Sequence, residues 1–206
     1  MIRFKTTDAH KKFWAERKID WKTQYLDTWN HPHRALIAEV LKTFNWISLW
    51  EAGCGPGANL VRIAKEFKGK QLGGSDVNAE AIELARATFV GGKFHVESVE
   101  DMLLSDDAVD VMLSDAALIY IDPTNIKKAV GEMVRITRNR LVLCEFHGTS
   151  WWERLKLRLT TGYNAYDYTK LLTEAGAYDV QMFKIPEQFW EGFPWNKWGY
   201  IITAKL

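Results

Sequence analysis

Residues 46–59 read WISLWEAGCGPGAN, and this stretch decides the fold. Its first half is a short apolar run with the length of a buried strand, and its second half carries Gly53, Gly55 and Gly57. Closely spaced glycines let the backbone turn sharply and approach a ligand, and a helix that follows points its free N–H groups at the bound group. The stretch therefore predicts a strand, a ligand-binding turn and a helix, in that order.

The chain beyond this stretch repeats the alternation of strand and helix. Short apolar runs predict strands, and the amphipathic stretches between them predict helices. The expected strands cover residues 46–53, 71–76, 93–97, 109–115 and 140–146, and the expected helices cover 58–67, 79–89 and 124–136. Successive β-α units of this kind build an α/β fold, in which helices cover a parallel sheet.

The two ends of the chain depart from this alternation. A helix over 168–175 should end at Gly176, and two further strands follow over 179–185 and 198–206. The connection between these strands has no helical pattern, so the last pair should be antiparallel. Residues 8–44 read as helices interrupted at His31-Pro32. We therefore expect a single domain over 1–206, with an N-terminal helical cap (1–45) and a core (46–206).

Composition excludes several classes of protein. The chain has 206 residues, 47% of them hydrophobic, and a formal net charge of +1, which is typical of a globular domain and not of one that coats nucleic acid. No apolar run approaches the roughly 20 residues of a membrane span. The N-terminus is too charged for a signal peptide, so we expect a cytoplasmic protein. The cysteines, Cys54 and Cys144, lack metal-ligand spacing, so we expect reduced thiols and no metal site.

A second and a third motif follow the glycines. Asp76 ends the second expected strand about 20 residues after them, where a carboxylate can accept hydrogen bonds from both hydroxyls of a ribose. The acidic stretch 95–101 follows the third expected strand, where a polar side chain and a backbone amide could contact the edge of an adenine. Together the three motifs predict a site for a nucleotide-like cofactor.

These motifs resemble those of the class I S-adenosylmethionine-dependent methyltransferases, particularly the small single-domain members. EAGCGPG (51–57) resembles their glycine-rich first motif, SDVN (75–78) the acidic end of their second strand, and VDVMLSDAALIY (109–120) their fourth-strand motif. The resemblance covers residues 46–206. It implies a Rossmann-like, doubly wound sheet of seven strands, mostly parallel with an antiparallel C-terminal strand and helices on both faces. The implied cofactor is S-adenosyl-L-methionine, with S-adenosyl-L-homocysteine as the product.

The resemblance also implies roles for individual residues. Asp76 would hold the ribose hydroxyls, and Ser98 stands where many relatives have Asp before the amide that contacts adenine. Arg34 could bind the methionine carboxylate, because a guanidinium can grip a carboxylate in two places. The implied cofactor-binding residues are Arg34, Glu51, Gly53, Cys54, Gly55, Gly57, Asp76, Val77, Ser98, Val99, Ser114 and Asp115.

Methyl transfer to an O or N atom depends mainly on placing the acceptor in line with the S–CH₃ bond. If the acceptor is a hydroxyl or a protonated amine, a base assists. His147 is the first candidate, since it follows the fifth expected strand and the carboxyl ends of parallel strands face the ligand crevice. The other candidates are Asp115, Tyr120, His31 and His33.

The chain contains 10 tryptophans, an unusually high number. We expect part of an aromatic set to form a pocket for a small, flat or cationic acceptor. A nucleic acid or protein acceptor is less expected, because no recognition surface for it stands out. The set comprises Trp14, Trp21, Tyr25, Trp29, Trp151, Trp152, Tyr163, Tyr166, Phe189, Trp190, Phe193 and Trp195.

Two alternatives stay open. Gly53-x-Gly55-x-x-Ala58 also fits a dinucleotide fingerprint, which would make the protein an NAD(P)-dependent oxidoreductase. Tyr166 and Lys170 have the spacing seen in short-chain dehydrogenases, but they stand near the C-terminus and not in a central helix. The second alternative is a non-catalytic S-adenosylmethionine-binding protein that serves as the partner of an active subunit.

Overall fold

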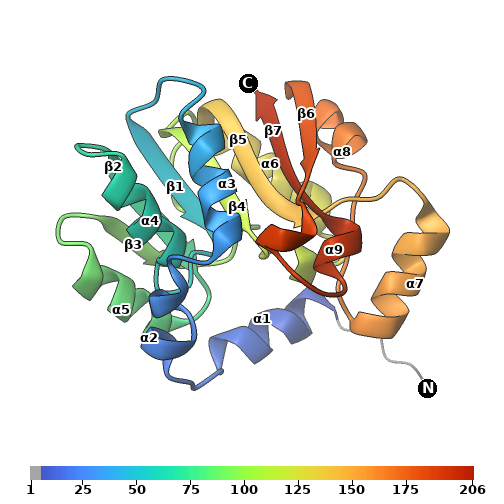
Figure 1. Ribbon diagram of the computed structural model, residues 1–206, viewed down its shortest axis with the longest axis horizontal. Coiled ribbons are helices and arrows are strands. Elements are labelled where there is room, and N and C mark those ends of the chain that lie inside the picture. The colour runs from blue at the N-terminus through green and yellow to red at the C-terminus, as the bar shows by residue number, and fades with distance from the viewer. Residues whose placement is uncertain (1–5) are drawn as a thin grey trace.

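A computed structural model describes residues 6–206. Within this range, seven strands form one sheet in the order β3-β2-β1-β4-β5-β7-β6 (Figure 1). Only β7 runs against its neighbours: it pairs antiparallel with both β5 and β6, whereas the pairs among β1 to β5 are parallel. The mostly parallel sheet with an antiparallel C-terminal strand is confirmed. The strands are β1 (Ser48–Ala52), β2 (Gln71–Asp76), β3 (Lys93–Val96), β4 (Val109–Asp115), β5 (Thr137–Phe146), β6 (Tyr178–Lys184) and β7 (Gly199–Lys205).

Helices cover both faces of the sheet. α3 (Pro32–Leu41), α4 (Ala58–Glu66) and α5 (Ala79–Thr88) bury their apolar sides in one core layer. α6 (Ile126–Ile136) and α8 (Tyr168–Glu174) do so on the opposite face. Since both faces are covered, β4 is buried along nearly its whole length, which explains why its sequence does not alternate between apolar and polar residues.

The N-terminal segment crosses the sheet at the carboxyl ends of the parallel strands. It comprises α1 (Thr7–Ala15), α2 (Trp21–Gln24) and the 3₁₀ helix η1 (Leu26–Thr28), and Figure 1 shows α1 running below the sheet. His31-Pro32 marks the start of α3, with Pro32 as its first residue, so the expected interruption is confirmed. Residues 1–5 of the expected cap (1–45) lie outside the described residues.

One connection differs from what the pattern predicts. The connection between β6 and β7 is not devoid of helix, because it forms the 3₁₀ helix η3 (Glu187–Phe189) and the short helix α9 (Trp195–Trp198). Pro186, Gly192 and Pro194 interrupt the sequence here, so these short helices leave no periodic pattern of apolar residues. Residues 151–161 form the helix α7, which carries the exposed and mutually stacked Trp151 and Trp152. None of the helices in residues 6–206 has the length and apolar character that crossing a membrane requires.

Candidate active site

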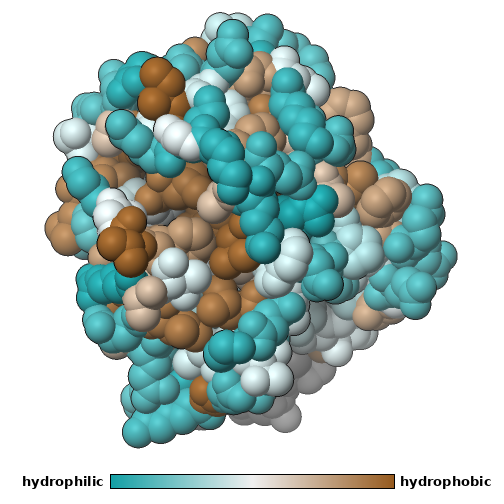
Figure 2. All heavy atoms as spheres, turned by 60° about the vertical axis from the view of Figure 1, so that its left-hand side comes forward, coloured by the Kyte–Doolittle hydropathy of each residue, from teal (hydrophilic) through white to brown (hydrophobic). Residues whose placement is uncertain are grey.

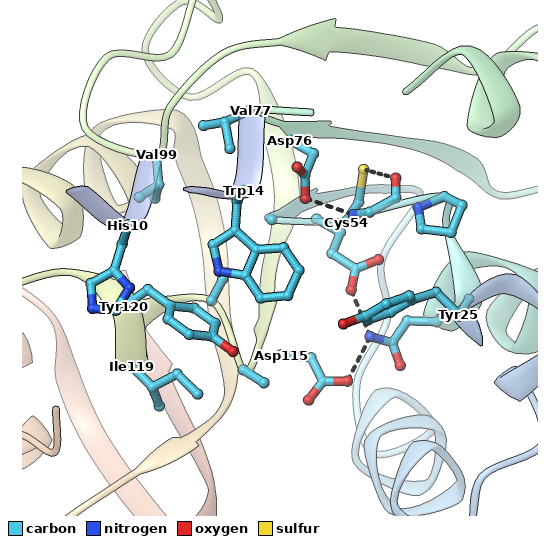
Figure 3. Close-up of a pocket in the computed structure, with 18 of the residues that line it drawn as sticks. His10, Trp14, Tyr25, Cys54, Asp76, Val77, Val99, Asp115, Ile119 and Tyr120 are labelled. Atoms are coloured by element: carbon cyan, nitrogen blue, oxygen red, sulfur yellow. Dashed lines mark hydrogen bonds between the residues drawn. The ribbon is translucent and has the colours of Figure 1, made fainter. Parts of the chain in front are cut away.

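A cavity of about 520 Å³ opens at the carboxyl ends of β1, β2 and β4. The loops after these strands form its floor, and side chains from α1, α2, α3 and the 190–195 segment form its walls. Figure 2 shows hydrophobic side chains gathered on this side of the molecule within a polar margin. Figure 3 shows Asp76, Val77 and Val99 at one end of the cavity and Asp115 at the other, with Trp14 and Tyr25 between them.

The loop after β1 needs its glycines for shape. Gly53 has φ +73°, and a Cβ atom there would lie 2.4 Å from the Cβ of Ala117. Gly55 has φ +51°, and a Cβ there would meet nothing within 4 Å, because the residue faces the open cavity. The loop therefore packs tightly at its first glycine and leaves room for a ligand at its second. Cys54, between them, is buried and also lines the cavity.

Asp76 is fixed by backbone donors on both sides. Its Oδ2 accepts from the Gly55 N–H at 2.9 Å, and its Oδ1 accepts from the Asn78 N–H at 2.9 Å. Burial raises the pKa of Asp76, although both of these hydrogen bonds oppose the shift. A carboxylate has about four acceptor sites, so Asp76 can still accept hydrogen bonds from two neighbouring hydroxyls.

Val77, Ser98 and Val99 line the same end of the cavity as Asp76. The Ser98 hydroxyl donates to Glu100 Oε2 at 3.0 Å, and Lys11 from α1 forms an ion pair with the same oxygen at 2.7 Å. The Ser98 hydroxyl is thus used within the protein. At this end of the cavity, the side chains of Val77 and Val99 provide the apolar surface against which a flat ring could pack.

A second cluster of acids lies around Asn59 near the start of α4. The Asn59 Nδ2 donates to Glu51 Oε1 at 2.6 Å and to Asp115 Oδ2 at 2.9 Å. The other oxygens, Glu51 Oε2 and Asp115 Oδ1, are buried and have no hydrogen-bond partner among residues 6–206. Burial raises the pKa of Glu51 to about 8, and the nearby Asp115 contributes to the rise. The unpaired oxygen of the ionised Asp115 is suited to an ammonium group, and an ammonium group bound there would favour the ionised form of Glu51 as a second partner.

Arg34 and His33, both from α3, contact the Asp115 carboxylate, and Arg34 balances its charge. Arg34 Nη1 and His33 Nε2 each lie 2.9 Å from Asp115 Oδ2. Burial alone would raise the pKa of Asp115, but its contacts with His33, Arg34 and the Asn59 amide bring the pKa well below its usual value. Arg34 also donates to Asn59 Oδ1 at 2.7 Å and to the Thr28 carbonyl at 3.1 Å. Most of its donors are therefore held within the protein, although the residue lines the cavity.

About half of the expected aromatic set lines the cavity. Trp190 stacks on Trp195 with ring centroids 3.5 Å apart, and it also stacks on His33 at 3.9 Å. Trp152 is 66% exposed and does not line the cavity. The members that line it are Trp14, Trp21, Tyr25, Tyr163, Trp190 and Trp195, and those that do not are Trp29, Trp151, Trp152, Tyr166, Phe189 and Phe193.

Tyr120 joins this aromatic wall. Its ring centroid lies 5.3 Å from Trp14 and 5.6 Å from Tyr163. Burial is the main cause that raises the pKa of Tyr120 well above its usual value, so the phenol keeps its proton and is suited to hydrogen bonding and not to proton abstraction.

Three of the expected site residues do not line the cavity. Gly57 packs against Phe89, to which a Cβ would come within 2.7 Å. Ser114 donates to Glu145 Oε1 at 2.7 Å, and the carboxylate of Glu145 also accepts from the backbone N–H groups of residues 117, 118 and 119. The Ser114 hydroxyl thus helps to hold the 3₁₀ helix η2 (Leu118–Tyr120).

His147 is the third expected site residue that does not line the cavity. It forms an isolated bridge with Tyr166, its Nδ1 faces the Tyr168 N–H at 3.3 Å, and its own N–H donates to the Trp198 carbonyl. The expectation that it faces the crevice is therefore corrected. The turn after β5 directs it between α8 and β7, where its ring lies 5.2 Å from that of Tyr200.

Sequence reasoning missed Asn59 and Asn78. Asn59 connects Glu51, Asp115 and Arg34, and Asn78 holds the position of α1 through its side chain. Both lie inside or beside the quoted motifs, and an asparagine directly after the glycine loop was the available signal.

The cluster of His33, Asp115 and Cys144 is not suited to a metal ion. His33, Asp115 and Cys144 bring potential ligand atoms within 4.8 Å of one another, but the Arg34 guanidinium occupies the same Asp115 oxygen and burial keeps the Cys144 thiol protonated.

Comparison with known proteins agrees with this geometry. Residues 50–140 match the family described as "Methyltransferase domain". The malonyl-(acyl-carrier protein) O-methyltransferase of Pectobacterium atrosepticum is 29% identical over 102 residues, which make up 50% of this chain and 39% of that protein. The chain thus spans well under half the length of this curated relative.

Two solved structures share the fold. The plantazolicin methyltransferase BpumL, in complex with SAH, is similar with a TM-score of 0.70 and 15% identity, over 97% of this chain and 94% of that chain. A SAM-dependent methyltransferase from Archaeoglobus fulgidus is similar with a TM-score of 0.59 and 17% identity, over 84% of this chain and 94% of that chain.

Proposed function

The chain belongs to the class I S-adenosylmethionine-dependent methyltransferases, and from this premise we propose that it methylates an O or N atom of a small-molecule acceptor in the cavity described above. The observation that carries the proposal is the placement of three carboxylates along one cavity. Asp76 stands at one end, and Glu51 and Asp115 stand at the other with one unpaired oxygen each. We also propose that residues 1–206 act as one methyltransferase domain.

These residues fit S-adenosylmethionine group by group. Asp76 would accept hydrogen bonds from the ribose hydroxyls, and Val77 and Val99 would flank the adenine. Glu51 and Asp115 would receive the ammonium group, because each has one buried oxygen without a hydrogen-bond partner among residues 6–206. When bound, the cofactor supplies an electrophilic methyl group on a positively charged sulfur.

Arg34 contributes to this site mainly by holding its neighbours. It fixes Asn59 and Asp115 together, so the acidic cluster stays in place before any ligand arrives. The residual donor capacity of its guanidinium would serve the methionine carboxylate, as the resemblance implies.

The acceptor would lie against the aromatic wall. The stack of His33, Trp190 and Trp195 and the cluster of Trp14, Tyr120 and Tyr163 offer flat apolar surfaces within the same cavity. Such walls hold small planar molecules by stacking. The name of the curated relative, an O-methyltransferase, supports oxygen as the atom that is methylated.

Calorimetric titration tests the proposal. Wild type and Asp76→Ala are titrated with S-adenosylmethionine, S-adenosylhomocysteine, NADH and NADPH, and Asp106→Ala is the matched control because Asp106 is exposed and lies outside the cavity. We expect both adenosyl ligands to bind wild type and Asp106→Ala equally. Asp76→Ala should weaken them by one to two orders of magnitude, which corresponds to about 1.5–3 kcal/mol for hydrogen bonds to a charged group.

The other outcomes separate the alternatives. Preference for a nicotinamide would favour an oxidoreductase. Equal affinity of the adenosyl ligands for wild type and Asp76→Ala would contradict the assigned ribose site. Binding of S-adenosylmethionine without any methyl transfer would favour a non-catalytic partner subunit.

A further inference from the structure

A line of three side chains runs from the cavity wall to the end of β4. His31 Nδ1 lies 2.5 Å from His33 Nδ1, and His33 Nε2 lies 2.9 Å from Asp115 Oδ2. His31 caps the N-terminus of α3 and His33 is the second residue of that helix, so the turn at Pro32 brings the two rings together. All three residues line the cavity.

The proton positions along this line follow from its acidic end. Asp115 is ionised and can only accept, so His33 Nε2 must carry the hydrogen that faces it. Arg34 pairs with the same oxygen, so the charge of Asp115 is already balanced and the ion pair needs no proton on the second nitrogen of His33. A neutral His33 therefore presents a bare Nδ1, and His31 Nδ1 must donate to it.

From this hydrogen-bonded line we infer that His31 is the general base of the proposed methyl transfer, with His33 and Asp115 as positioning residues, and that the acceptor is a phenolic hydroxyl. The inference rests on the proposed function. With Nδ1 used as a donor, Nε2 of His31 carries the free lone pair. Asp115 fixes the tautomer of His33 and, through His33, the tautomer of His31, as a carboxylate orients a catalytic imidazole in other enzymes.

The strength of this base sets the class of acceptor. Burial is the main cause that lowers the pKa of His31, and the Arg34 guanidinium lowers it further, while Asp115 acts in the opposite direction. Such an imidazole is neutral at physiological pH but weak. It is much better matched to a phenol, with a pKa near 10, than to an aliphatic alcohol, which is far less acidic.

The surroundings of His31 favour the same class. Its ring lies 5.4 Å from that of Trp190, which belongs to the stacked wall. A flat aromatic acceptor held on this wall would lie next to His31. A cationic amine is disfavoured by the Arg34 guanidinium on α3 and by the positive sulfur of the cofactor.

The proton balance of the step is simple. As the phenolic oxygen forms its bond to the methyl carbon, the sulfur keeps the electron pair of the broken C–S bond and the O–H proton passes to His31 Nε2. His31 is then a cation whose Nδ1–H remains bonded to His33. The proton is released to solvent when the product leaves.

The first test needs no ligand. Nitrogen-15 NMR of histidine-labelled protein reports the tautomer and pKa of each ring, with His31→Asn and His95→Asn used for assignment. We expect an Nδ1–H tautomer for His31, an Nε2–H tautomer for His33, and titration of His31 below the ordinary value. A doubly protonated His33, or an Nε2–H tautomer of His31, would overturn the inference.

The second test separates a base from a merely structural residue. The probes are 4-methylphenol, which needs a base, and 4-nitrophenol, which is largely ionised at about pH 8.5 and needs none. His31→Asn should lower kcat for 4-methylphenol by about 100-fold, within the usual range for general-base catalysis, and change kcat for 4-nitrophenol by less than about threefold. His95→Asn, outside the cavity, is the matched control.

Each remaining outcome has a definite meaning. Equal losses with both phenols would show that His31 has a structural role and not that of a base. Binding of S-adenosylhomocysteine without methylation of either phenol would overturn the acceptor class and leave the proposed function standing. Loss of adenosyl binding in wild type would instead contradict the proposed function.

Discussion

At the scale of single residues, the buried carboxylates determine the behaviour of the site. Glu51 stands at the end of β1 with one oxygen bonded to Asn59 and the other unpaired. Its pKa of about 8 in the folded protein lies above the ordinary value of 4.5, because burial disfavours the charged form. Between about pH 4.5 and pH 8, Glu51 therefore keeps its proton in the folded state and loses it in the unfolded state.

This difference makes stability depend on pH. The free energy of unfolding should fall as pH rises from about 4.5 to about 8, because the folded protein must then release a proton that the unfolded chain has already lost. Glu51→Gln removes this contribution and keeps an acceptor for Asn59. We expect the free energy of unfolding of the variant to rise relative to that of wild type by up to about 1.4 kcal/mol per pH unit across that window.

Urea unfolding of wild type and Glu51→Gln at several pH values measures the gain. Glu145, whose pKa burial raises to about 7, is present in both proteins and does not enter their difference. If the free energies of unfolding of the two proteins changed in parallel with pH, this would contradict a raised pKa for the buried Glu51.

At this scale, the sequence predicts where a residue lies when that position follows from a strand-turn-helix unit. Asp76 and Gly55 lie together at the cavity as their motif predicts. His147 shows the limit of this reasoning. The rule that strand ends face the crevice applies to it, but the antiparallel β7 and its Trp198 hold it elsewhere, and no local pattern reveals that contact.

At the scale of elements, α1 is held over the cavity at both of its ends. At its start, the Thr7 N–H donates to Asp122 Oδ2 at 2.7 Å and the Asp122 N–H donates to Thr7 Oγ1 at 2.8 Å. At its end, the Asn78 Nδ2 donates to the Trp14 carbonyl at 2.8 Å and the Arg17 carbonyl at 3.0 Å. Trp14 and Lys11 of α1 thereby face the predicted adenosine end of the cavity.

The side chain of Asn78 has two separable roles. Its oxygen accepts from the Ala81 N–H and caps α5, whereas its nitrogen holds the end of α1. Asn78→Asp keeps the cap and removes the donor, and it places a negative charge against the carboxyl end of a helix. We expect amide hydrogen exchange in α1 to accelerate by roughly 10- to 100-fold, as for a loss of about 1–3 kcal/mol in local stability.

Hydrogen exchange measured by mass spectrometry checks this expectation. Exchange in α5 should stay at the wild-type rate, and Asn125→Asp at the start of α6 serves as a control that leaves α1 unchanged. Faster exchange in α5 with no change in α1 would show that the cap, and not the contact with α1, is the role of Asn78.

At the scale of the whole molecule, the sheet could be predicted and the cavity only in part. Strands and helices follow from the local spacing of apolar residues, and the antiparallel last strand follows from the lack of a helix long enough for a crossover. The aromatic wall depends on segments far apart in the chain. Trp14, Tyr120 and Trp195 come from three such segments, and nothing in the sequence separates them from the exposed Trp152.

The His31, His33 and Asp115 line illustrates the same point. Each residue was a candidate base by its chemistry, but only the packing of α3 against the end of β4 orders them into one hydrogen-bonded path. Local patterns therefore identify the groups capable of chemistry, and the fold decides which of them act together.

The central claim is that the cavity binds the methyl donor through Asp76 at one end and Glu51 and Asp115 at the other. A crystal structure of the protein with S-adenosylhomocysteine tests it most directly. We predict that both ribose hydroxyls donate to the Asp76 carboxylate and that the ammonium group meets the oxygens of Glu51 and Asp115 that now lack partners. A ligand bound elsewhere, or one whose ribose makes no contact with Asp76, would contradict the account.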